Sequence, residues 1–165
     1  MLRRTLLLSA ATLGLSACGF ALRGAPSYPF TTIFVRVAEA SALGNELKRN
    51  LAAGGALEVV TEPKRLDSVE VVLDITTDQR EKSVASSTSS GQVREFQLRV
   101  RVKFRLRTPQ GKELIPEVEL LQQRDISYSE TQALSKEAEE QLLYRSMQTD
   151  IVQQIMRRIA AVQAL

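Results

Sequence analysis

The most regular pattern in the chain spans residues 95–107, where apolar and polar side chains alternate one by one. Successive side chains of a β-strand point to opposite faces, so the alternation predicts a strand with one buried and one solvated face. The apolar face comprises Phe96, Leu98, Val100, Val102, Phe104 and Leu106. The opposite face comprises Gln97, Arg99, Arg101, Lys103, Arg105 and Arg107, five of which are cationic.

Three further segments have the alternation of strands: residues 30–37, 68–76 and 114–128. Pro109 and Gly111 lie between the strand at 95–107 and the last of these, which predicts a hairpin. The polar tract 83–91 is typical of a loop, either a mobile segment that contacts a ligand or partner, or a long hairpin connection. The short apolar run 57–60 is compatible with a strand or with a connection.

Two segments have the periodicity of amphipathic helices. In the first, Ser41 is a candidate N-cap, leucines recur every four residues, and Gly54 and Gly55 end the helix. In the second, Ser135 is the candidate cap of a helix that runs to about residue 161 and is about 40 Å long. Its apolar stripe comprises Leu143, Met147, Ile151, Ile155 and Ile159.

The order of elements is therefore strand, helix, strand, strand, strand, helix. Each element has one apolar face, and 44% of the 165 residues are hydrophobic, which suffices for one core. We expect an α+β fold in the form of a two-layer sandwich. Its mostly antiparallel sheet carries both helices on one face, within a single domain spanning residues 31–165.

The first residues have the features of a secretory signal: Arg3 and Arg4, a short apolar run, and small residues before Cys18. The sequence Leu15-Ser-Ala-Cys18 resembles a bacterial lipobox, which implies cleavage after residue 17 and lipidation of Cys18. The alternative is an ordinary secretory signal with an incidental cysteine. Acylation accounts for the single cysteine of an exported chain, and residues 18–30 are then a lipidated tether. By analogy with bacterial lipoproteins, Gly19 implies export to the outer membrane.

Charge and composition exclude several kinds of function. Without Arg3 and Arg4 the formal charge falls from +3 to 3 − 2 = +1, so net charge does not predict a nucleic-acid partner. The chain has no histidine, and its one cysteine is the lipidation candidate, so the usual ligands of transition metals and the usual catalytic pairs are missing. We expect no enzyme and no cofactor other than the covalent lipid on Cys18.

The five cations on one strand face allow two interpretations. In the first, the face is solvated and its charges are matched across strands. A hairpin centred on Gln110 places Lys103 opposite Glu117, Arg101 opposite Glu119 and Arg107 opposite Glu113. A second hairpin, centred in the polar tract, places Asp74 beside Arg99 and Glu70 beside Lys103. In the second interpretation, surplus Arg101, Arg105 and Arg107 bind anionic groups or contact the polar surface of a partner.

Taken together, the chain resembles the LptE family of lipopolysaccharide-assembly lipoproteins. The resemblance rests on Cys18-Gly-Phe-x-Leu-Arg-Gly24, on the Ser/Thr-Gly-Gln segment leading into Arg94-Glu-Phe-Gln-Leu98, and on Ala133-Leu-Ser-Lys-Glu137. It implies an outer-membrane lipoprotein that faces the periplasm, plugs the lumen of the β-barrel LptD, assists barrel assembly and binds lipopolysaccharide without covalent chemistry. The alternative is a free-standing periplasmic lipoprotein that carries or senses a lipid without a barrel partner.

The resemblance also implies candidate ligand contacts. Lys136 occupies the family's basic position at the start of the last helix, although an exposed helix lysine is an equally simple interpretation. The family's basic residue in the loop before Gln92 is absent, because Ser89 and Ser90 stand there. Arg94 or Lys82 would then have to replace it. The candidate contacts with lipopolysaccharide are thus Lys136, Arg94, Lys82, Arg101, Arg105 and Arg107.

Overall fold

The computed structural model describes residues 27–55 and 57–163, so the signal peptide, Cys18 and most of the tether lie outside the described residues. The elements, in chain order, are β1 (Thr32–Arg36), α2 (Ala42–Ala53), β2 (Glu58–Val60), the 3₁₀ helix η2 (Pro63–Ser68), β3 (Val71–Ser87), β4 (Val93–Arg107), β5 (Glu113–Ser127), the 3₁₀ turn η3 (Glu130–Gln132) and α3 (Ala133–Ala160).

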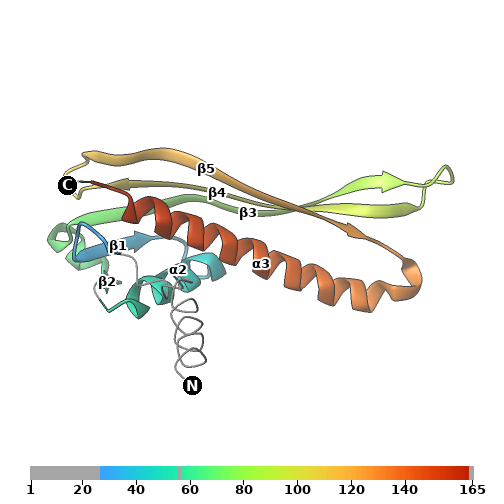
Figure 1. Ribbon diagram of the computed structural model, residues 1–165, viewed down its shortest axis with the longest axis horizontal. Helices are drawn as coiled ribbons and strands as arrows, with labels where there is room; N and C mark the ends of the chain where they lie inside the picture. Colours follow the sequence, from blue (N-terminus) through green and yellow to red (C-terminus); the bar gives the residue numbers. More distant parts are fainter. Residues whose placement is uncertain (1–26, 56, 164–165) are drawn as a thin grey trace, which may run out of the picture.

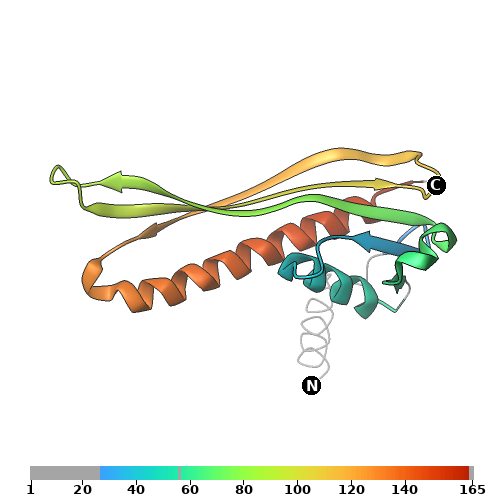
Figure 2. The same cartoon turned by 180° about the vertical axis from the view of Figure 1, so that it is seen from behind.

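The five strands form one mixed sheet in the order β2-β1-β3-β4-β5. The short strands β1 and β2 pair in parallel, as do β1 and β3, whereas the long pairings β3–β4 and β4–β5 are antiparallel. Helices α2 and α3 lie on one face of this sheet (Figures 1 and 2). The prediction of an α+β fold with both helices on one face is confirmed, and β2 settles the ambiguous run at 57–60 as a strand.

The main core lies between the sheet and the two helices. The apolar face of β4 is almost completely buried there, against Leu43, Leu47 and Leu51 of α2 and the predicted stripe of α3. Phe30, at the boundary between the predicted tether and the first predicted strand, is also part of this core. The burial of these side chains is the main stabilising contribution, at about 25 cal/mol per Å² of apolar surface removed from water.

The face of the sheet opposite the helices, called the outer face below, is buried only near its β1 end. Phe34, Val60, Val69 and Val72 form a second small cluster there, with Leu66 of η2 packed against it. The sequence predicted a single apolar face for the first strand, but Ile33, Phe34 and Val35 are all buried. Central strands covered on both faces lose the simple alternation of a half-exposed strand.

The beginning of α2 agrees with the prediction. The Oγ of Ser41 accepts a hydrogen bond from the Gly44 amide at 2.9 Å, which is N-cap geometry. Gly44 lies where α2 meets the end of β1: a Cβ built on it would be 2.4 Å from Cγ1 of Val37. Only glycine fits this close approach. At the other end Gly55 has φ +68°, as expected for a glycine after a helix.

Two predicted boundaries were wrong. Ser135 does not cap α3, which begins at Ala133 after the turn η3; its hydroxyl donates to the carbonyl of Gln132 at 2.8 Å. Residues 83–87 are not a loop: they continue β3 and pair with the first residues of β4, leaving a turn at 88–91. Backbone hydrogen bonds hold this part of the hairpin, so the strand needs no apolar pattern there.

The predicted register was correct at one position only, although the predicted ion pair between Arg101 and Glu119 does form at 2.8 Å. Arg107 lies opposite Glu113, but Lys103 lies opposite Glu119, because irregularities between Phe104 and Arg107 shift the register by two residues. In the other hairpin, Asp74 pairs with Arg105 rather than Arg99. Glu70 precedes β3 and accepts hydrogen bonds from the amides of Thr31 and Thr32 instead of facing Lys103.

Candidate functional site

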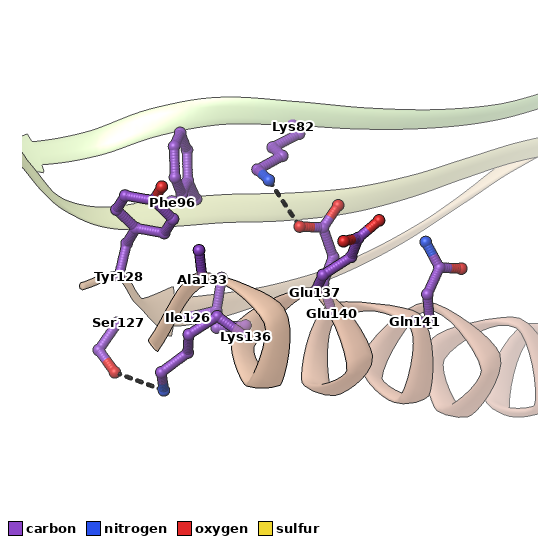
Figure 3. A pocket seen from close by; sticks show the side chains of 10 residues that line it. All are labelled: Lys82, Phe96, Ile126, Ser127, Tyr128, Ala133, Lys136, Glu137, Glu140 and Gln141. Carbon is purple, nitrogen blue, oxygen red and sulfur yellow. Dashed lines mark hydrogen bonds and ion pairs between the residues drawn. The ribbon is translucent and has the colours of Figure 1, made fainter. Parts of the chain in front are cut away.

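A pocket of about 280 Å³ lies where the far part of the β3–β4 hairpin passes the first turns of α3 (Figure 3). Its apolar side consists of Phe96, Ile126 and Tyr128. The rings of Phe96 and Tyr128 pack edge to face, and their centres are 5.2 Å apart. Helix α3 supplies Ala133, Lys136, Glu137, Glu140 and Gln141. The pocket thus combines an aromatic wall with charged groups, an arrangement suited to an amphiphile.

Two of the six candidate ligand contacts, Lys82 and Lys136, line this pocket. The ammonium of Lys82 lies 4.4 Å from the centre of the Phe96 ring and 2.6 Å from Oε2 of Glu140. Lys136 donates to Ser127 at 3.0 Å and to Glu139 at 2.9 Å, so its ammonium is turned to the rim, away from Lys82 (Figure 3).

The charges that line the pocket balance. Lys82 and Lys136 contribute +2, Glu137 and Glu140 contribute −2, and the sum is 2 − 2 = 0. An incoming anion therefore has to replace Glu140 as the partner of Lys82. The side chain of Lys82 is 39% exposed and that of Glu140 is 16% exposed, so the ion pair is partly buried, but its cation can be reached from solvent by an incoming anion.

Arg94 lies at the same end of the molecule but not in this pocket. It lines two neighbouring hollows on the β4–β5 side, and both of them share Tyr128 with the pocket. The carbonyl of Arg94 accepts a hydrogen bond from the Tyr128 amide at 2.8 Å. Tyr128 thus separates Arg94 from the two lysines.

The other three candidates lie on the outer face of the sheet. Arg105 and Arg107 donate to Oδ2 of the buried Asp74, at 3.0 and 2.9 Å, and Nε of Arg36 lies 3.5 Å from its other oxygen. Arg101 contacts Glu119 at 2.8 Å and Glu81 at 3.6 Å. The structure therefore does not bring Arg101, Arg105 and Arg107 together with Lys82 and Lys136, and all three are engaged by acids.

Sequence reasoning missed three residues that matter here: Phe96 and Tyr128 as the aromatic wall, and Glu140 as the partner of Lys82. Phe96 was assigned to the core from its alternation, but α3 leaves it half-buried at this end of the hairpin. No cluster of metal-ligating side chains occurs within the described residues. Among the helices that the structure describes, none has both the length and the apolar character needed to cross a membrane.

Comparison with known proteins decides the family. The model of the LptE family, described as lipopolysaccharide-assembly, matches residues 30–159. The chain belongs to the LptE family. No curated protein matches it. The prediction from the sequence is confirmed at this level: a lipoprotein of the lipopolysaccharide-assembly family, which is not a family of enzymes.

Solved structures agree with membership in the LptE family. A lipoprotein B from Nitrosomonas europaea is 35% identical, with a TM-score of 0.71 over 87% of this chain and 91% of that one. The rare lipoprotein B from Shewanella oneidensis is 26% identical, with a TM-score of 0.65 over 79% and 95%. A minor lipoprotein from Acinetobacter baumannii, at 21% identity and a TM-score of 0.63, shares the fold.

Proposed function

We propose that this protein is anchored in the outer membrane by lipid on Cys18, faces the periplasm, plugs the lumen of the β-barrel LptD, assists barrel assembly and binds lipopolysaccharide. Family membership over residues 30–159 is the observation that carries the proposal. The mechanism is non-covalent: the protein holds an amphiphile and a barrel in place, and no bond of the ligand is broken.

The shape of the molecule supports a plug. The described chain begins beside β1, whose pairing with β3 is confined to residues 71–74, whereas the turn at 88–91 lies at the opposite end of the molecule (Figures 1 and 2). From Asp74 to Lys82, which lines the pocket, the strand advances about 26 Å. The apolar band of a membrane barrel is about 25 Å tall. A domain tethered on the periplasmic side can therefore carry the pocket across a distance similar to the height of that band.

The outer face supports a polar partner surface. Arg101, Lys103 and Glu119 form a half-exposed ion-pair network, and Arg36 and Arg105 are also half-exposed around Asp74. The interior of a membrane barrel is polar, so such a face can lie against it without desolvating a large apolar patch.

The barrel partnership is tested by mild-detergent pull-down of the lipidated protein from its native membranes at its natural expression level. We expect a large β-barrel protein in about one-to-one ratio. Recovery of the protein alone, with normal surface lipopolysaccharide after its depletion, contradicts the plug and favours the free-standing lipid carrier.

Ligand binding is tested with Lys136→Asp, and with Lys112→Asp as a control, because Lys112 lies in the exposed β4–β5 turn away from the pocket. We expect lipopolysaccharide binding to weaken by about fivefold or more in the first variant, since a charge-assisted contact is lost. The control should bind as the wild type does. Equal binding by the two variants would remove Lys136 from the site.

A further inference from the structure

A second hollow, of about 610 Å³, lies between α2, α3 and β3. We call it the arginine cleft, because Arg49, Arg80 and Arg145 line it together with Glu46, Gln148 and the neighbouring residues Ala42, Asn45, Gln141 and Thr149. It adjoins the first pocket, which contains Lys82 and Lys136 and is called the lysine pocket below. Gln141 lines both, and along α3 Arg145 lies about 14 Å beyond Lys136.

The arginine cleft carries a surplus of positive charge. Three guanidinium groups face one carboxylate, so the lining sums to 3 − 1 = +2. Within the described residues, no ion pair to an acid involves Arg49, Arg80 or Arg145. Their situation differs from that of Lys82, Arg105 and Arg107, each of which has an acid as partner.

A chain of polar contacts centred on the buried Gln148 holds the cleft in shape. Gln148 is 8% exposed; its amide accepts from Arg80 at 2.7 Å and donates to Oε2 of Glu46 at 2.5 Å. The hydroxyl of Thr149 donates to the other oxygen of Glu46 at 2.8 Å. Glu46 is therefore occupied by neutral donors, and it is not the ion-pair partner of any of the three arginines.

Arg80 is further positioned by Tyr144, whose ring centre lies 5.4 Å from the guanidinium carbon. The Tyr144 hydroxyl donates to the carbonyl of Glu81 at 2.8 Å. Burial raises the pKa of this hydroxyl, and the carboxylate of Glu140 raises it further, while the guanidinium of Arg80 acts in the opposite direction. One guanidinium edge is bonded to Gln148, and Arg49 and Arg145 lie on exposed turns of their helices.

We infer that the arginine cleft, lined by Arg49, Arg80 and Arg145, is an anion site that binds a phosphate-bearing ligand. A phosphate monoester carries a charge of about −1.5 to −2 at pH 7 and three acceptor oxygens, which matches a +2 lining of planar donors. Arginine suits this purpose because its guanidinium can contact two phosphate oxygens at once. The phosphate belongs either to the glycolipid that occupies the lysine pocket or to a separate small molecule.

The site is tested on the lipidated full chain in non-ionic detergent, by following the arginine side-chain Nε–H resonances in NMR while inorganic pyrophosphate is added at low salt. The test variant is Arg49→Ser/Arg145→Ser, which leaves Arg80 and its packing intact. The control is Arg157→Ser/Arg158→Ser, which removes the same charge from exposed positions on α3 that do not line the cleft. Urea unfolding confirms that both variants are folded.

We expect saturable shifts in the wild type and in the control, with a dissociation constant about tenfold higher in the test variant because two of three charged donors are lost. Shifts that do not saturate, or equal affinity of the two variants, overturn the inference. A second titration with purified lipopolysaccharide identifies the source of the phosphate. Weaker binding by the test variant assigns the cleft to the glycolipid, and unchanged binding assigns it to a separate phosphate compound.

The outcome does not depend on the proposed function. If lipopolysaccharide fails to bind the wild type at all, the proposed ligand is wrong, whereas the pyrophosphate titration still reports on the arginine cleft. Conversely, if only Lys136→Asp loses lipopolysaccharide binding, the proposed function is supported, and the pyrophosphate titration alone decides whether the arginine cleft binds phosphate.

Discussion

Strands β3 and β4 run through two regions that differ in how cations are held. In the proximal region, beside β1, Arg105 and Arg107 meet the buried Asp74, whose side chain is 5% exposed. In the distal region, towards the turn at 88–91, Lys82 meets Glu140 in the wall of a pocket, and the side chain of Glu140 is 16% exposed. In both regions a strand cation meets an acid, but the acid of the proximal region is buried more deeply.

That difference separates a structural role from a binding role. A buried carboxylate is stabilising only while its cationic partners remain, and removing one partner of a buried ion pair strongly lowers the free energy of unfolding. An exposed ion pair contributes about 0–1 kcal/mol and exchanges readily for another partner. We therefore assign Arg105 and Arg107 mainly to the fold and keep Lys82 and Lys136 as the ligand candidates.

The largest expected effect tests the proximal region. Asp74→Asn leaves Arg36, Arg105 and Arg107 around a neutral amide, and we expect the free energy of unfolding to fall by about 3 kcal/mol. Urea unfolding measures it. Glu119→Gln is the matched control on the same outer face, where both ion pairs are exposed, and it should cost less than about 1 kcal/mol. Similar losses in the two variants would remove the distinction between the regions.

A second prediction concerns the seam between α2 and β1, which also belongs to the proximal region. Gly44→Ala places a methyl group 2.4 Å from Cγ1 of Val37, and we expect a loss of about 2 kcal/mol from overpacking. Gly54→Ala is the control, because its Cβ meets only the Leu51 carbonyl oxygen at 3.8 Å. Adding Val37→Ala should restore part of the loss in a double-mutant cycle. If the effects of Gly44→Ala and Val37→Ala simply add, a steric clash between the two side chains is contradicted.

Some features of the proximal region could be predicted from the sequence. The alternation in β4 correctly identified its buried face, and Ser41 correctly marked the start of α2, because both follow from local periodicity and capping. Asp74 was assigned to a solvated face, yet it is buried. The signal for a buried ion-pair cluster at Asp74 was available in the sequence: Asp74 is the single acid within the apolar run Val71–Ile75, and the partner strand carries a series of arginines.

The distal region could not be predicted in the same way. Residues 83–87 are polar and exposed on average, so nothing local distinguishes the end of a long strand from a loop. The register of the distal residues depends on irregularities in the proximal region, at Ile75–Thr77 and Phe104–Arg107, which change which charges face each other. The lysine pocket needs the hairpin to pass the start of α3, and that is a tertiary arrangement. Lys82 and Lys136 were named through family resemblance, not through spacing.

The next prediction tests the exchangeable partner in the distal region. Glu140→Gln removes the acid that holds Lys82 at 2.6 Å, so an incoming anion no longer has to displace it. We expect affinity for lipopolysaccharide to rise about threefold and stability to change by less than about 1 kcal/mol. Glu130→Gln, in η3 and outside the pocket lining, is the control. Weaker binding by Glu140→Gln would mean that Glu140 itself supports the ligand.

The smallest effect is a pH dependence that belongs to the proximal region alone. The amide of Thr31 donates to Glu70 and holds the pKa of this carboxyl below its usual value; the Thr32 amide and the Thr31 hydroxyl act in the same direction, against a partial opposing effect of burial. A group whose pKa is lower in the folded state contributes stability above its unfolded pKa, near 4.5, and loses it as the pH falls through the folded value.

Glu70→Gln should therefore be less stable than the wild type at pH 7, by less than about 1 kcal/mol because the side chain is exposed. The gap should narrow below about pH 4, where the wild-type carboxyl takes up its proton. Urea unfolding at pH 7, 5 and 3 measures this, and Glu62→Gln, at the end of the loop before η2, is the control because its side chain makes no capping bond. A gap that stays constant with pH would show that the carboxylate charge of Glu70 does not hold β1 against the start of β3.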